Sequence, residues 1–141
     1  MSNPLCDISK EAKIAKNVRI NSFVTIQKNV VIDEGCWIGS NVTIMEGARI
    51  GKHCKIFPGA VISAIPQDLK FGGEDSLVEI GDNTIIRECV TINRGTNYSG
   101  TTKIGQNCLI MAYVHIAHDC NIGNNVILVN SVQLGGHITI G

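Results

Sequence analysis

The stretch VTIQKNVVIDEGCWIGSNVTIMEGARI, residues 24–50, carries an isoleucine at every sixth position. A helix with 3.6 residues per turn does not produce this spacing, and neither does the two-residue alternation of an amphipathic strand. Six residues is the step of hexapeptide-repeat β-helices, in which each short strand supplies one side of a coil. The stretch therefore predicts a parallel β-helix.

The same phase extends along nearly the whole chain. Aliphatic residues recur every six positions over 8–62, 80–92 and 104–140. The residues at this phase that are not aliphatic are Ser2, Asp68, Glu74 and Tyr98. Ser2 precedes the repeat, and the other three fall within 63–79 and 93–103. We expect these two stretches to be loops that leave the column between coils.

A second register lies two residues before each aliphatic position and holds small residues, mostly valine, alanine and cysteine. Side chains two apart on a strand share a face, so both registers point into one narrow interior. A three-sided coil takes eighteen residues at this step, which equals the interval from Ile62 to Ile80. We therefore predict an all-β fold of three-sided coils, with residues 1–141 as a single domain.

The composition argues against several classes of function. Twelve Lys and Arg balance twelve Asp and Glu, so nothing suggests binding to nucleic acid or to an anionic membrane surface. No apolar run reaches transmembrane length, and the polar start at residues 1–4 does not resemble a signal peptide. Five of the six cysteines occupy the inward register, and no pair has CxxC spacing. We expect free, buried thiols and hence a cytoplasmic protein.

Three of the four histidines concentrate in two segments, VHIAHDC (114–120) and LGGH (134–137). On an eighteen-residue coil, Gly136 stacks over His118 and His137 stacks over Asp119, with about 4.8 Å between strands. His115 lies between two inward positions and therefore points outward. A single corner histidine is an ordinary surface residue, but the cluster as a whole favours a functional site.

Metal binding is the sharpest alternative for this cluster. Trimeric β-helices of the γ-class carbonic anhydrase type hold zinc with histidines from two adjacent subunits. The spacing of His115 and His118 differs from the four-residue gap expected between the paired ligands of that class, and the two rings leave from a face and from a corner. We therefore rank general-base chemistry above a metal-dependent hydratase and predict no metal site.

Several motifs together resemble one family: QDLKFGGE (67–74), EIGD (79–82), IRECVTINRGT (86–96), HIAHDC (115–120) and LGGH (134–137). They resemble the UDP-N-acetylglucosamine O-acyltransferases, hexapeptide-repeat enzymes that catalyse the first step of lipid A biosynthesis. The resemblance implies a left-handed β-helix and a homotrimer with active sites in the clefts between subunits. The residues themselves add support for a trimer, because an eighteen-residue coil projects Trp37, Leu109 and Ile127 outward from one face.

The family's reaction implies roles for several residues. It moves a 3-hydroxyacyl chain from acyl carrier protein to the 3-hydroxyl of UDP-N-acetylglucosamine, without a cofactor because the acyl donor is already a thioester. A sugar hydroxyl is a poor nucleophile, and a histidine base contributes typically about 10²–10⁴-fold. His118 matches the family's base, Asp119 the carboxylate that orients it, and the backbone N–H of Gly136 the oxyanion donor.

Further positions match residues that bind substrate in the family: Gln67, Asp68, Lys70, His115 and His137. Without the resemblance, Asp68 and Lys70 would be interpreted as part of a solvated loop. Cys120 belongs to the inward register, which argues against a cysteine nucleophile beside the cluster.

The chain also departs from the family. Gly135 stands where alanine is common, and the family's later coils and C-terminal helical domain are absent from the sequence, which ends at Gly141. Two alternatives therefore stay open beside the O-acyltransferase: the metal-dependent hydratase and an inactive structural β-helix fragment. The related N-acyltransferase is less favoured, since that enzyme carries an N-terminal uridine-binding domain and the repeat here begins by Cys6.

Overall fold

The computed structural model describes residues 4–141, which form three parallel sheets. Ser2 lies outside the described residues, as does most of the polar start of the chain. Sheet A has the order β1 (Asp7–Ile8), β4 (Thr25–Ile26), β7 (Thr43–Ile44), β10 (Val61–Ala64), β13 (Thr91–Asn93), β16 (His115–Ile116) and β19 (Gln133–Leu134). Sheet B has the order β2 (Lys13–Ile14), β5 (Val31–Ile32), β8 (Ala48–Ile50), β11 (Leu77–Ile80), β14 (Thr101–Ile104), β17 (Asn121–Ile122) and β20 (Thr139–Ile140). Sheet C runs from β3 (Arg19–Ile20) through β6 (Trp37–Ile38), β9 (Lys55–Ile56), β12 (Ile85–Ile86) and β15 (Leu109–Ile110) to β18 (Ile127–Leu128).

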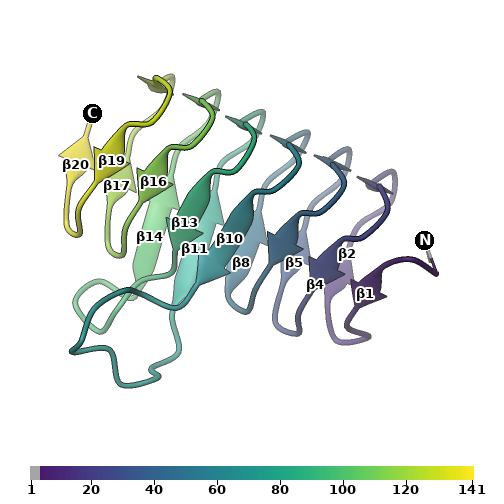
Figure 1. Cartoon of the computed structure of the whole chain (residues 1–141), viewed down its shortest axis with the longest axis horizontal. Helices are drawn as coiled ribbons and strands as arrows, with labels where there is room; N and C mark the ends of the chain where they lie inside the picture. Colours follow the sequence, from purple (N-terminus) through teal and green to yellow (C-terminus); the bar gives the residue numbers. More distant parts are fainter. Residues whose placement is uncertain (1–3) are drawn as a thin grey trace.

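The three sheets are the three sides of a left-handed parallel β-helix, which confirms the predicted fold class. Figure 1 shows the coils stacked along the long axis, with the two termini at opposite ends and two loops projecting together at one edge. Among residues 4–141 the structure contains no helix that is long and apolar enough to cross a membrane.

The coil takes eighteen residues, as predicted, but the interval that suggested this length does not span a coil. Thr25 pairs with Asp7 on one side and with Thr43 on the other, eighteen residues away in each direction. Ile62, by contrast, lies on sheet A and Ile80 on sheet B. The interval between them holds one side of a coil and a loop excursion, whose combined length happens to equal one turn.

The two loops are shorter than the sequence predicted. β10 continues to Ala64 and β11 begins at Leu77, so the first loop comprises residues 65–76 rather than 63–79. The second loop comprises residues 94–100 rather than 93–103, because β14 begins at Thr101. The ends of both stretches stay in the sheets, where they continue the pairing between coils, as Leu77 does with Thr101.

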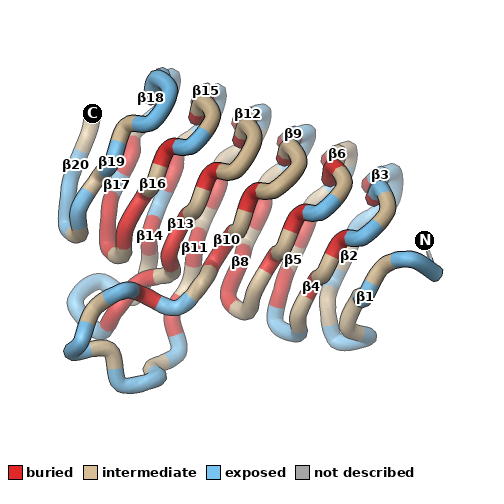
Figure 2. The backbone as a smooth tube through the Cα atoms, viewed as in Figure 1, coloured by how far each residue is buried: buried red, intermediate tan, exposed pale blue. Residues whose placement is uncertain are grey.

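The interior is filled by the two predicted inward registers. Ile38, Ile56 and Ile62 are fully buried, as are most of the isoleucines at this phase, and Figure 2 shows buried positions along the length of the column. Cysteines at the small-residue positions are buried as expected, except for the half-buried Cys6. All six cysteines of the chain are free thiols.

The matched substitutions Ile62→Ala and Ile65→Ala test this packing. Ile62 is 0% exposed inside the column and Ile65 is 57% exposed in the first loop. Ile62→Ala should lower the free energy of unfolding by about 2–5 kcal/mol because it leaves a cavity, whereas Ile65→Ala should change it by less than about 0.5 kcal/mol. Urea unfolding of each variant measures the difference, and equal effects would contradict the packing described.

Candidate active site

The predicted cluster forms at one corner of two successive coils. His118 and Asp119 follow β16, and Gly136 and His137 follow β19 on the next coil. The N–H of His137 donates a hydrogen bond to the carbonyl of His118 at 3.1 Å. A Cβ atom added at Gly136 would lie 2.5 Å from Cε1 of the His118 ring. The predicted stacking of residue 136 over residue 118 is confirmed.

The conformation of the corner directs these side chains. Asp119 has φ of 60° and His137 has φ of 65°, values that place both in the left-handed region. Asparagine occupies many equivalent corners of the column, because its short polar side chain tolerates this conformation. The N–H of Asp119 donates to the hydroxyl of Thr102 at 2.9 Å, which stabilises the strained corner.

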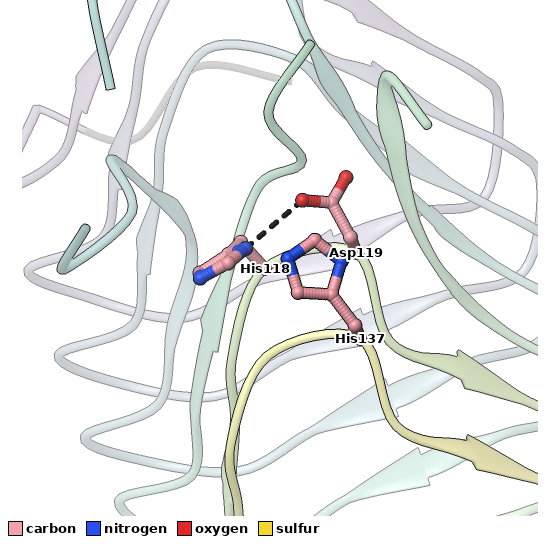
Figure 3. Close-up of side chains that lie close together, drawn as sticks. All are labelled: His118, Asp119 and His137. Carbon is pink, nitrogen blue, oxygen red and sulfur yellow. Dashed lines mark hydrogen bonds and ion pairs between the residues drawn. The ribbon is translucent and has the colours of Figure 1, made fainter. Parts of the chain in front are cut away.

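Buried Asp119 and half-buried His118 form a hydrogen-bonded pair. Oδ2 of Asp119 lies 2.9 Å from Nδ1 of His118 (Figure 3). The side chain of Asp119 is 0% exposed and that of His118 is 12% exposed. Hydrogen-bond donors in the second loop reach the same carboxylate: the N–H of Thr96 at 3.0 Å, the hydroxyl of Thr96, and the hydroxyl of Ser99 at 2.6 Å.

These contacts keep the carboxylate ionised. Burial alone would raise the pKa of Asp119, but the hydrogen bonds from Ser99 and Thr96, with a further one from His118, outweigh burial and hold that pKa well below its ordinary value. The sequence prediction did not include Thr96 or Ser99. A signal was present, because an eighteen-residue coil places Thr101, the first residue after the second loop, one rung from Asp119.

The first loop brings a second carboxylate to the other ring nitrogen of His118. Oδ2 of Asp68 lies 3.7 Å from Nε2 of His118. Oδ1 of Asp68 accepts a hydrogen bond from the N–H of Lys70 at 3.0 Å, which folds the loop locally. The two loops border a pocket of about 300 Å³ lined by Asp68, Lys70, Glu74, Thr96, Asn97, Tyr98 and His137.

The remaining predicted substrate residues lie in different surroundings. His137 is exposed. Its ring packs edge-on against the rings of Tyr98 and His118, with ring centroids 4.4 Å and 4.9 Å apart. His115 points outward from β16, as predicted, and its Nδ1 lies 2.7 Å from the Thr91 hydroxyl. Burial lowers the pKa of His115, so the neutral ring is favoured. Gln67 is exposed and is not among the residues that line the pocket.

Tyr98 is a contact that the sequence interpretation missed. It occupies a repeat position where an aliphatic residue would point into the column, yet it lies in the second loop and is 76% exposed. A bulky aromatic at such a position was the available signal. Cys120, in contrast, is buried as predicted, and burial raises the pKa of its thiol.

His118, Asp119 and His137 also offer potential metal ligands, with donor atoms within 4.8 Å of one another. Zinc holds nitrogen and oxygen ligands at about 2.0–2.2 Å, so the three side chains would have to draw together. Nδ1 of His118 and both oxygens of Asp119 already take part in hydrogen bonds. This arrangement favours an oriented base over a metal-ligand set.

Comparison with known proteins assigns the family. The bacterial transferase hexapeptide (six repeats) family matches residues 29–64 and 101–136. This chain belongs to that family. A member from Xylella fastidiosa, named acyl-[acyl-carrier-protein]–UDP-N-acetylglucosamine O-acyltransferase, is 53% identical over 140 residues, which cover 99% of this chain and 53% of the relative.

Solved structures of UDP-N-acetylglucosamine acyltransferases superpose closely on the column. The UDP-N-acetylglucosamine acyltransferase of Bacteroides fragilis is 55% identical with a TM-score of 0.96, over 99% of this chain and 55% of that one. The corresponding enzyme of Francisella novicida is 48% identical with a TM-score of 0.96, over 99% of this chain and 51% of that one. The chain thus spans about half the length of these relatives.

The close approach of Gly136 to His118 yields a matched pair of variants. Gly136→Ala places a methyl group against the imidazole, so the ring should move and its bond to Asp119 should break. Gly135→Ala adds the same methyl group where nothing lies within 4 Å. Imidazole NMR should show altered His118 resonances in Gly136→Ala alone. Unchanged resonances in that variant would contradict the site geometry.

The low pKa of Asp119 predicts a loss of stability in acid. The folded chain binds this proton less readily than the unfolded chain, so the carboxylate's contribution to the free energy of unfolding is complete above the ordinary Asp pKa of about 3.9 and declines as the pH falls below it. Asp119→Asn cannot titrate, and its free energy of unfolding should decline less steeply below about pH 4. Urea unfolding at stepped pH measures both slopes, which would be equal if the carboxylate were unperturbed.

Proposed function

We propose that this chain carries the acyl-transfer site of an enzyme that moves a 3-hydroxyacyl group from acyl carrier protein to the 3-hydroxyl of UDP-N-acetylglucosamine, the first step of lipid A biosynthesis. The observation that carries the proposal is the hydrogen-bonded pair of His118 and buried Asp119, with Nδ1 bonded to the carboxylate at 2.9 Å and Nε2 directed toward Asp68. The names of the relatives that match the chain support the same substrates.

His118 acts as the general base. Because an ionised carboxylate only accepts hydrogen bonds, the proton of the neutral ring lies on Nδ1 and the lone pair lies on Nε2. The sugar hydroxyl gives its proton to Nε2 as its oxygen attacks the thioester carbonyl. When the C–S bond breaks, the proton passes from Nε2 to the leaving sulfur. A base of this kind contributes about 10²–10⁴ in rate.

The backbone N–H of Gly136 is the proposed donor to the thioester oxygen. It donates to no acceptor within residues 4–141, and Gly136 lies directly beside the imidazole. The absence of a side chain at this position leaves space for the reacting carbonyl next to the base. Losing one such donor costs about 10²–10³ in rate.

The substrate residues divide between the pocket and its surroundings. Asp68 lies beside Nε2 of His118, where its carboxylate is placed to accept hydrogen bonds from sugar hydroxyls. Lys70 lines the same pocket and offers a positive charge for the diphosphate. His137 borders the pocket, while His115 and Gln67 lie outside its lining and would contact parts of the substrates that extend beyond it.

A homotrimer is part of the proposal, because one face of the column carries apolar side chains beside the two cations Arg19 and Lys55. Trp37, Ile85, Leu109 and Ile127 project outward from sheet C, and Ile127 is 61% exposed. Trp37 packs edge-on against Phe57 at 5.0 Å. Contact with a second copy would remove this apolar surface from water. Six free thiols support the proposed cytoplasmic location.

The test is acyl transfer from 3-hydroxyacyl carrier protein to UDP-N-acetylglucosamine. It uses this chain and the same chain extended past Gly141 with the corresponding segment of the Bacteroides fragilis relative. The extended protein should transfer the acyl group, and His118→Ala should reduce kcat by about 10²–10⁴. The control variant is His53→Gln, at an exposed position, which should retain the full rate of acyl transfer.

A folded extended protein that transfers nothing, beside a working relative, would contradict the assignment. Stoichiometric zinc in the purified protein, lost in His118→Ala, would favour the metal-dependent hydratase instead. Full activity of His118→Ala would overturn the assigned base alone.

A further inference from the structure

We propose that the second loop fixes the tautomer of His118 through Asp119, with Thr96 and Ser99 as the positioning residues. The inference rests on the proposed function, because it assigns the loop a part in preparing the base. Thr96 borders the pocket, but its hydroxyl and that of Ser99 contact Asp119 and not the imidazole. They act on the carboxylate that in turn holds the imidazole.

The hydrogen bonds to Asp119 fill its acceptor positions. Oδ1 accepts from the N–H of Thr96 at 3.0 Å, from the Ser99 hydroxyl at 2.6 Å and from the N–H of Ser99 at 3.4 Å. Oδ2 accepts from the Thr96 hydroxyl and faces Nδ1 of His118 at 2.9 Å. A carboxylate has about four lone-pair sites. The loop's donors occupy Oδ1 and one position on Oδ2, and the other position on Oδ2 faces His118. The buried carboxylate therefore cannot rotate without losing loop contacts.

The direction of each hydrogen bond is determined by its neighbours. The Thr96 hydroxyl accepts from the N–H of Tyr98 at 3.2 Å, so its own proton is free for Asp119. The Ser99 hydroxyl has a second acceptor, the Thr101 carbonyl at 3.0 Å, but Asp119 lies closer at 2.6 Å. An ionised carboxylate only accepts hydrogen bonds, so Nδ1 of His118 donates to Asp119. The competing carboxylate oxygen, Oδ2 of Asp68, lies 3.7 Å from Nε2, beyond hydrogen-bond distance, and favours the Nε2–H tautomer less than the 2.9 Å contact with Asp119 favours Nδ1–H. Nε2 is then left unprotonated in the neutral ring.

The loop itself is held by bonds that do not involve the carboxylate. The N–H of Gly100 donates to the Thr96 carbonyl at 2.7 Å, and the N–H of Gly95 donates to the Leu77 carbonyl at 3.2 Å. A Cβ at Gly95 would lie 2.4 Å from the Thr101 nitrogen, so only glycine allows this closure. The N–H of Asn97 donates to Glu74 of the first loop at 3.2 Å. Loss of a hydroxyl from Thr96 or Ser99 should therefore leave the loop in place.

The first test measures the tautomer directly on this chain. Imidazole ¹⁵N NMR, with His118 assigned by a His118→Gln variant, should show the proton on Nδ1 of the neutral ring. In the double variant Thr96→Val with Ser99→Ala, a substantial Nε2–H population should appear. Thr96→Ser retains the hydroxyl and should keep the original tautomer. Thr101→Val, on a residue without a side-chain bond to Asp119, should do the same.

Each outcome of this test is decisive, and none depends on turnover. Nε2–H as the main tautomer of the unaltered chain would overturn the proposal. An unchanged tautomer in the double variant would overturn it too. If the double variant does not fold, Thr96→Val alone against Thr96→Ser makes the same comparison. A failure of acyl transfer would contradict the proposed function, but the tautomer of His118 could still be measured and interpreted.

The second test is a double-mutant cycle in the extended, acyl-transferring protein. Thr96→Val should lower kcat about ten-fold with KM unchanged, since one hydrogen bond to a charged group is lost. In an Asp119→Asn background the same substitution should have no further effect, because the residue acts through that carboxylate. A second ten-fold loss in that background would show that Thr96 acts independently and would overturn the proposed role.

Discussion

The hydrogen bonds between successive coils determine the positions of the corner residues of the site, His118, Asp119, Gly136 and His137. Strands of two to four residues have no stability of their own, so each coil depends on the coils above and below it. Their parallel pairing keeps residues eighteen apart on the same rung position, as with His115 and Gln133. The same pairing carries through the corner, where it joins His137 to the His118 carbonyl. The imidazole and the Gly136 backbone meet for this reason.

The β-helix and the corner that holds His118 could be predicted from the sequence because both follow the six-residue repeat. The inward isoleucines, the eighteen-residue coil and the stacking of residues 136 and 118 follow from one spacing. The same spacing misled at Ile62 and Ile80, since the hexad phase is identical on all three faces and does not tell which face a strand occupies. Ile62 pairs with Ile92, thirty residues away, so this turn of the column holds twelve residues more than the usual eighteen. Twelve residues equal two sides of a coil, and the sequence pattern could not distinguish this loop from two such sides.

The contacts made by the loops could not be predicted in the same way. Thr96, Ser99 and Tyr98 lie where the repeat is interrupted, and their positions depend on contacts with distant residues rather than on a period. The result is a site in two parts. The column supplies a rigid corner with His118 and Asp119, and the loops supply polar side chains that satisfy the buried carboxylate and line the adjoining pocket.

The stacking of the imidazole against the next coil can be observed directly in solution. A Cβ atom added at Gly136 would lie 2.5 Å from Cε1 of His118, so the Hα proton of Gly136 that takes this direction should show a strong nuclear Overhauser effect to the Hε1 proton of His118. That cross-peak should persist in the unaltered chain without any ligand. Its absence, with both resonances assigned and the β-helix intact, would show that base and backbone donor are not neighbours and would contradict the account.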